Sequence, residues 1–296
     1  MKPILVLAAL LGTGAALAKP NVVVSFQPYY TVVSDIAGNR ANVSLILKPG
    51  VSPHTFDPTP RDIKTIASAN LAFMNGAGID EWLATLVKSS GSKARVVEFA
   101  ERLEYTPLES MDHGEHDHDH DHDHDHDHEN HDPHIWLDAS IMAKAALLIG
   151  NELAKTDPAN AAFYRANAKK ENAKLLALHA ELKKALAPIK NTSIVTFHGA
   201  WPYWSAAYGP KIAAAVEPFP GKEPSARYVK EVVDIIRARK VKAVFAEPTL
   251  PEAPARTIAE SAGAKLGVLI PEGSPKVADY YAMMRANKNE LLRLLK

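Results

Sequence analysis

The sequence of 296 residues contains no cysteine. This absence excludes disulfide bonds, thiolate metal sites, a cysteine nucleophile and an amino-terminal lipidated cysteine. Long apolar runs are also scarce, because after the first 18 residues no segment approaches the ~20 apolar residues that a membrane-spanning helix needs. Hydrophobic residues nonetheless make up 47% of the chain. The composition therefore predicts a globular protein with room for two domains of ordinary size.

The chain also lacks a net charge, because 34 Lys and Arg residues balance 34 Asp and Glu residues. This balance hides an uneven distribution. Residues 112–132 carry ten acidic side chains and no basic one, so the rest of the chain has 34 basic against 24 acidic residues. The basic residues are spread along the chain without a DNA- or RNA-binding motif, and we therefore expect no nucleic-acid partner.

The amino-terminal sequence is typical of a secretory signal peptide. Lys2 supplies the positive charge, residues 4–17 form an apolar stretch, and Ala16-Leu17-Ala18 is a small-residue cleavage pattern. A membrane-spanning helix is the alternative, but this stretch is too short and contains two glycines. We therefore predict a chain that is cleaved after Ala18 and exported to the periplasm, where it is not a lipoprotein.

Beyond the signal peptide, runs of β-branched residues alternate with segments of helical spacing. Asn21–Phe26 and Asn42–Leu47 have the length and composition of strands. Thr59 followed by Pro60 predicts the start of a helix. Strands that alternate with helices predict parallel sheets whose loops bind ligands at the strand ends. The predicted fold class is α/β, with two α/β domains of mostly parallel sheets.

One long backbone helix is predicted to join the two domains, because neither Gly nor Pro occurs between Pro158 and Pro188. The metal site described below is expected in the cleft between the domains. The predicted segments are a signal peptide (1–18), an N-terminal α/β domain (19–156) that includes a His/Asp-rich loop (112–132), a linking helix (157–188) and a C-terminal α/β domain (189–296).

Nine of the 13 histidines lie in the His/Asp-rich loop, where they alternate with aspartate. They are His113, His116, His118, His120, His122, His124, His126, His128 and His131. Such a polar segment cannot bury enough apolar area to order itself, so we expect disorder without metal. A flexible linker of 20 residues spans on the order of 25 Å. The loop is therefore interpreted as an accessory metal collector beside a site built elsewhere.

Three of the other four histidines lie where a parallel sheet offers ligands. His54 is in a loop between a strand and a helix, His134 precedes the helix predicted from Asp138, and His198 follows a predicted strand. Neutral imidazole suits zinc and the late first-row metals, so three converging histidines predict a Zn²⁺ site. His179 lies in the middle of the long helix and is assigned a structural role.

Five ordered motifs resemble those of the cluster A-I metal solute-binding proteins, and most closely the periplasmic zinc-binding component of high-affinity zinc ABC importers. The motifs are Val51–Phe56, Asp132–Asp138, Thr196–Trp201, Gly221–Ser225 and Phe245–Pro248. The resemblance covers essentially the whole mature chain. It implies a metal bound between two domains, delivery to a membrane permease, and a protein that is not an enzyme.

In the zinc branch of this family, the residues that match His54, His134 and His198 are ligands. Many members have an aspartate ligand near the carboxyl terminus, at a position that is Ile270 in this chain. The fourth coordination position is therefore open between water, Glu272 and His131. A periplasmic zinc chaperone is a further expected partner, and the chain is expected to be a monomer.

Two other functions compete with zinc capture for import. A zinc-dependent hydrolase is the first, because three histidines and an open water position also describe a catalytic zinc. It would need a general base and a substrate pocket, and no sequence pattern marks such a pocket. A His-rich zinc buffer or sensor is the second, but it leaves the three outlying histidines unexplained.

Overall fold

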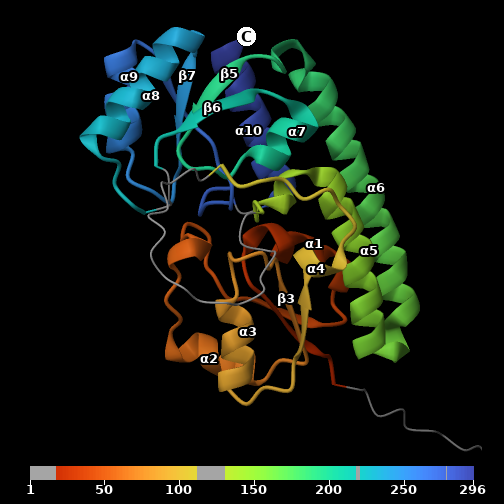
Figure 1. Cartoon of the computed structure of the whole chain (residues 1–296). Helices are drawn as coiled ribbons and strands as arrows, with labels where there is room; N and C mark the ends of the chain where they lie inside the picture. The colour runs from red at the N-terminus through yellow and green to blue at the C-terminus, as the bar shows by residue number, and fades with distance from the viewer. Residues whose placement is uncertain (1–17, 112–130, 218–220, 278) are drawn as a thin grey trace, which may run out of the picture.

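The computed structural model describes residues 18–111, 131–217, 221–277 and 279–296. These residues form two four-stranded sheets, with strand orders β2-β1-β3-β4 and β6-β5-β7-β8, and each pairing within them is parallel. The strands are β1 Asn21–Val24, β2 Asn42–Leu45, β3 Leu71–Met74, β4 Arg95–Glu98, β5 Ser193–Thr196, β6 Lys211–Ala215, β7 Ala243–Ala246 and β8 Lys265–Val268. The predicted fold class is confirmed, with one sheet in each half of the molecule (Figure 1).

Helices cover both sheets. They are α1 Gln27–Ala37, α2 Pro60–Ala67, α3 Trp82–Ser89, α4 Phe99–Arg102, α5 Ala139–Thr156, α6 Ala161–Leu186, α7 Pro202–Tyr208, α8 Ala226–Arg239, α9 Ala253–Ala262 and α10 Tyr280–Leu295. The predicted start of α2 is confirmed, since Thr59 and Asp62 form a reciprocal capping box ahead of the helix. The sequence-based prediction lacks α1, whose β-branched residues have modest helix propensity. Burial of its Tyr29, Val32 and Val33 face outweighs that propensity.

The long helix is present but shorter than predicted. Pro158–Asn160 forms a 3₁₀ turn, α6 follows with 26 residues, and a second 3₁₀ turn covers Ala187–Ile189. At ~1.5 Å per residue, α6 is about 39 Å long. It packs against α1 and α5 of the first half and against α7 and α10 of the second. Figure 1 shows it beside both halves, as expected of a connecting helix; the exact domain boundaries stay a prediction.

One core cluster contains side chains from both halves of the chain. Phe26 and Tyr29 of the first half share it with Trp136, and Trp204 and Tyr280 of the second half belong to the same cluster. Because such interiors are close-packed, a shift of one half would disturb contacts of the other. The loops between the two sheets therefore pack against one shared hydrophobic core.

No helix in the described ranges is both long and apolar enough to cross a membrane. The predicted signal peptide, apart from Ala18, lies outside the described residues. The loop histidines from His113 to His128 also lie outside them, whereas His131 is described.

Candidate metal centre

In the described part of the chain, His54, His134 and His198 form a group whose candidate ligand atoms all lie within 4.8 Å of one another. Their ring centroids are 5.2–5.6 Å apart. His54 comes from the loop after β2 and His198 from the loop after β5. The group therefore lies between the two halves, at the carboxyl ends of parallel strands, where such sheets bind ligands.

His54 is placed by a short 3₁₀ turn, Pro53–Thr55. The Ser52 hydroxyl accepts a hydrogen bond from the His54 backbone N–H at 3.4 Å, which caps the turn. Gly50, with a φ of 91°, precedes the turn, and a Cβ there would lie 2.9 Å from Pro275 Cδ. The loop that carries His54 thus touches the loop that carries Glu272.

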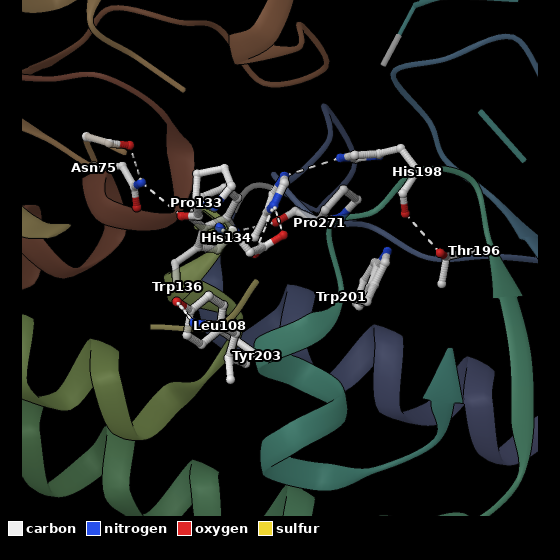
Figure 2. A network of polar contacts seen from close by, with 12 residues as sticks. Asn75, Leu108, Pro133, His134, Trp136, Thr196, His198, Trp201, Tyr203 and Pro271 are labelled. Carbon is white, nitrogen blue, oxygen red and sulfur yellow. Dashed lines mark hydrogen bonds and ion pairs between the residues drawn. The ribbon is translucent and has the colours of Figure 1, made fainter. Parts of the chain in front are cut away.

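His134 is oriented by Asp132, which lies two residues earlier. The Asp132 carboxylate accepts the backbone N–H of His134 at 3.0 Å and lies 3.3 Å from its Nδ1. Asn75 donates its side-chain amide to the Pro133 carbonyl at 2.9 Å, which holds the same segment from β3 (Figure 2). His134 is 3% exposed and Asp132 1%. Burial raises the pKa of Asp132 to about 7. In its ionised form the carboxylate only accepts hydrogen bonds, so His134 then carries its proton on Nδ1 and directs Nε2 toward the group.

His198 has an equivalent arrangement. Its Nδ1 lies 2.6 Å from Glu247 Oε2, and Glu247 follows β7 in the same sheet. The Thr196 hydroxyl donates to the His198 carbonyl at 2.9 Å and fixes the backbone after β5 (Figure 2). Carboxylates behind ligating histidines fix the tautomer and raise ligand basicity in many metal sites. Two of the three imidazoles therefore have the support expected of metal ligands.

The spacing between the two buried imidazoles matches a tetrahedral metal site. His134 Nε2 and His198 Nε2 are 3.3 Å apart (Figure 2). Two nitrogens that each lie ~2.0–2.1 Å from a tetrahedral zinc are separated by about 3.3–3.4 Å. Two imidazole lone pairs approach this closely only when a proton or a cation lies between them. The site is therefore arranged to exchange one proton for a metal ion.

The pKa values of the three imidazoles diverge. Burial, with the neighbouring histidines, lowers the pKa of His54 to about 2, and burial followed by the charge of His198 holds that of His134 well below its usual range. Burial also lowers the pKa of His198, but the charge and hydrogen bond of Glu247, with the charges of Glu272 and Asp132, outweigh it, so that the pKa rises to about 9. At neutral pH the single bridging proton thus belongs to His198.

Glu272 is the buried carboxylate that the sequence offered as a fourth ligand. Its side chain is 4% exposed, and among the described residues its Oε2 has no hydrogen-bond partner. Burial raises its pKa to about 8, while the charge of His198 opposes the shift. The group of described ligand atoms around the three histidines does not include it. A carboxylate oxygen buried without a partner is nonetheless a candidate for a cation.

The other candidates for the fourth position differ from Glu272. His131 is half-buried and pairs with Glu109 through an isolated antiparallel bridge, and the group of described residues does not include it either. The Ile270 side chain packs against the core, and its backbone N–H and C=O both bond to Asn287 at 2.8 Å. Ile270 is thus a packing residue.

His179 lies away from the group and has other partners. Its Nδ1 lies 3.1 Å from Asp138 Oδ1 and 3.2 Å from the Tyr208 hydroxyl, an arrangement that ties α6 to α5 and α7.

The sequence-based prediction of the site did not include the supporting roles of Asp132 and Glu247. For Asp132 a signal exists, since a carboxylate two residues before a histidine can reach its Nδ1. Glu247 lies 49 residues from His198, and only the pairing of β5 with β7 brings them together.

Comparisons with known proteins identify the family of the chain. Residues 22–293 match the family described as zinc-uptake complex component A, periplasmic. The chain is 31% identical over 288 residues to the zinc-binding protein AdcA of Streptococcus pyogenes, covering 93% of this chain but 56% of that relative. It is 30% identical over 295 residues to the high-affinity zinc uptake system protein ZnuA of Brucella abortus, with 90% and 88% covered.

A crystal structure of ZnuA superposes with a TM-score of 0.80 at 25% identity, over 94% of this chain and all of the other. The chain spans little more than half the length of the first relative and nearly all of the others. The resemblance that the five motifs indicate is thereby confirmed. With three converging imidazoles at its centre and a family match from residue 22 to residue 293, the chain belongs to the family of periplasmic zinc-uptake complex component A.

Proposed function

We propose that this chain is the solute-binding component of a zinc importer, which captures Zn²⁺ and delivers it to the membrane permease of an ABC transporter. His54, His134 and His198 are the proposed ligands. The observation that carries the proposal is the convergence of these imidazoles, two of which have a buried carboxylate behind Nδ1. The zinc-uptake relatives support the same ion and the same kind of partner.

Glu272 is the proposed fourth ligand. It is buried, its Oε2 has no partner among the described residues, and its charge interacts with His198. Because it lies outside the group of closely spaced ligand atoms, its carboxylate has to move toward the imidazoles when zinc binds. Filling this position distinguishes capture from hydrolysis, since a catalytic zinc keeps one position open for water. The protein is accordingly proposed not to be an enzyme.

The His/Asp-rich loop is proposed as an accessory collector. Both of its ends are held near the site: Glu109 bridges to His131, and the Asp132 N–H donates to the Leu108 carbonyl at 2.8 Å. The loop therefore starts and ends next to the segment that carries His134. We further propose export with cleavage after Ala18, a monomer free in the periplasm without a lipid anchor, and a periplasmic zinc chaperone as a second partner.

A competitive zinc titration against a chromophoric chelator tests the assignment. The proteins are residues 19–296, the same chain without residues 113–130, and His198→Ala in that deletion. We expect one tight site that survives the deletion and weakens by at least ~100-fold with His198→Ala. His179→Ala is the matched control, because this histidine lies outside the group, and it should retain tight binding. Loss of tight binding with the loop would instead favour a zinc buffer.

Delivery requires a separate test. In cells that lack their own zinc-binding component, the chain should restore growth in chelator-treated medium when it is expressed with its permease. His198→Ala should not restore growth, whereas His179→Ala should. Tight zinc binding without any restoration by the unaltered chain would refute the transport part of the proposal and leave the site intact.

A further inference from the structure

The loop that carries Glu272 is fastened to the segment that carries His134 by one buried hydrogen bond. Trp136 lies two residues after His134 in the 3₁₀ turn Ile135–Leu137, and its side chain is fully buried. Its indole Nε1 donates to the Pro271 carbonyl at 2.6 Å across 135 residues of sequence. The Pro271 carbonyl belongs to the peptide unit that leads directly into Glu272. Figure 2 shows Trp136, His134 and Pro271 close together between the two halves.

The Trp136 ring is itself held rigidly. It packs edge-on against Phe26 with centroids 4.8 Å apart, and against the His134 imidazole at 5.1 Å. Its backbone carbonyl accepts the Tyr280 hydroxyl at 2.7 Å. The indole N–H therefore has a fixed direction, set by residues of both halves. A rigid donor of this kind restricts the position of its acceptor more than a flexible side chain does.

The backbone on either side of Glu272 has separate anchors. Asn287 binds both polar groups of Ile270 from α10, and Gly273, with a φ of 92°, lies against the Gln27 side chain. Asn287 ties the loop only to its own half. Gln27 and Gly50 contact the loop from the first half, and Trp136 hydrogen-bonds it to the segment that carries His134. The free Oε2 shows that Glu272 is not fixed through that atom.

We propose that Trp136 is a positioning residue of the metal site: its indole N–H holds the Pro271 carbonyl so that the Glu272 carboxylate can close on a metal bound to His134. This inference rests on the proposed function, because it takes Glu272 as a ligand. It adds that the fourth ligand is placed by the same segment that supplies the second histidine. Binding at His134 and closure by Glu272 are thereby coupled.

A double-mutant cycle tests the coupling, using Trp136→Phe, Glu272→Gln and the pair. Trp136→Phe keeps an aromatic ring but removes the N–H. It should weaken zinc binding by about 10–100-fold when Glu272 is present and by less than ~2-fold in the Glu272→Gln background. Trp204→Phe is the matched control and should change affinity by less than ~2-fold. Trp204 is 1% exposed, and its Nε1 has no partner in the described part of the chain.

Bound Co²⁺ gives a second readout, because its visible absorption depends on the ligand set. The spectrum of Trp136→Phe should shift toward that of Glu272→Gln, while that of Trp204→Phe should match the unaltered protein. A merely structural role of Trp136 would lower the melting temperature without this spectral shift. Equal effects of Trp136→Phe in both backgrounds would overturn the inference, and unchanged affinity in Glu272→Gln alone would instead refute Glu272 as a ligand.

A measurement on proteins that retain Trp136 keeps the inference testable if Trp136→Phe does not fold. The chain has four tryptophans, so the indole N–H signals can be resolved by NMR in ¹⁵N-labelled protein and assigned by substituting the other three. Zinc should shift the Trp136 signal more in the unaltered protein than in Glu272→Gln. The same shift in both would show that Trp136 does not act through Glu272.

Discussion

The bridging proton of His198 leads to a specific prediction for Glu247→Gln. Zinc binds only the neutral imidazole, so the proton on His198 competes with the metal. With a pKa of about 9, His198 is ~99% protonated at pH 7, and the apparent zinc affinity is about 100-fold below its limit. Each further unit of acidification lowers it about tenfold. The affinity should therefore rise with pH up to about 9 rather than level off above the ordinary histidine range.

Glu247→Gln removes the main cause that raises this pKa. Burial then lowers the pKa of His198 while the charges of Glu272 and Asp132 still raise it, so its proton competes less with zinc. The variant also loses the carboxylate behind the ligand, which should weaken zinc binding by ~10–100-fold where no proton competes. The two effects have opposite signs. The variant should bind more weakly than the unaltered protein at pH 9, and the two affinities should converge between about pH 8 and pH 7.

The assay is a competitive zinc titration at pH values from 6 to 9. Between pH 6 and 8, the slope of log affinity against pH should be lower in Glu247→Gln, by at most about one unit per pH unit. Glu272, with a pKa of about 8, adds a proton dependence, and Glu247 is one cause that raises this pKa. The two proteins are therefore compared in a Glu272→Gln background, so that the difference in slope reports on His198. Asp234→Asn, an exposed change of equal charge on α8, is the control. Parallel slopes in the two proteins would refute the reasoning.

Two further predictions concern stability. Gly50→Ala should lower the free energy of unfolding by about 1–3 kcal/mol in urea titrations, because the residue has positive φ and its Cβ would meet Pro275. Gly78→Ala is its control: φ is similarly positive but no described atom lies within 4 Å of the new Cβ, so a smaller loss is expected. Zinc at 100 times its dissociation constant should add about 2.7 kcal/mol of stability. In thermal unfolding, chelator should remove this gain. In His198→Ala, which lacks one ligand, added zinc should leave the melting temperature unchanged.

Local patterns in the sequence were sufficient for most of the fold. Alternating β-branched runs and helical segments predicted the parallel sheets, and the Thr59 cap and the uninterrupted stretch before Pro188 predicted α2 and α6. Helix α1 has no such local signal, because its residues favour strands and become helical only when Tyr29 and its neighbours are buried. Element ends shifted by a few residues, since the last hydrogen bonds depend on the partner strand.

The candidate site also has a part that the sequence predicts and a part that it does not. Histidines at the ends of predicted strands could be chosen from the sequence, because parallel strands bring their carboxyl ends to one edge. The partners of these histidines depend on strand order: Glu247 reaches His198 because β5 pairs with β7. The contact of Trp136 with Pro271 joins residues 135 positions apart and has no local signature.

The sequence by itself determined which side chains could bind a metal and roughly where the chain turns, because these depend on residue type and short-range spacing. The tertiary structure alone decided which imidazole holds the proton, which carboxylate stays buried without a partner, and which indole fastens one loop to another. Those properties depend on burial and on distances of a few ångströms between distant segments. Such distances are set only when both halves pack on their common core.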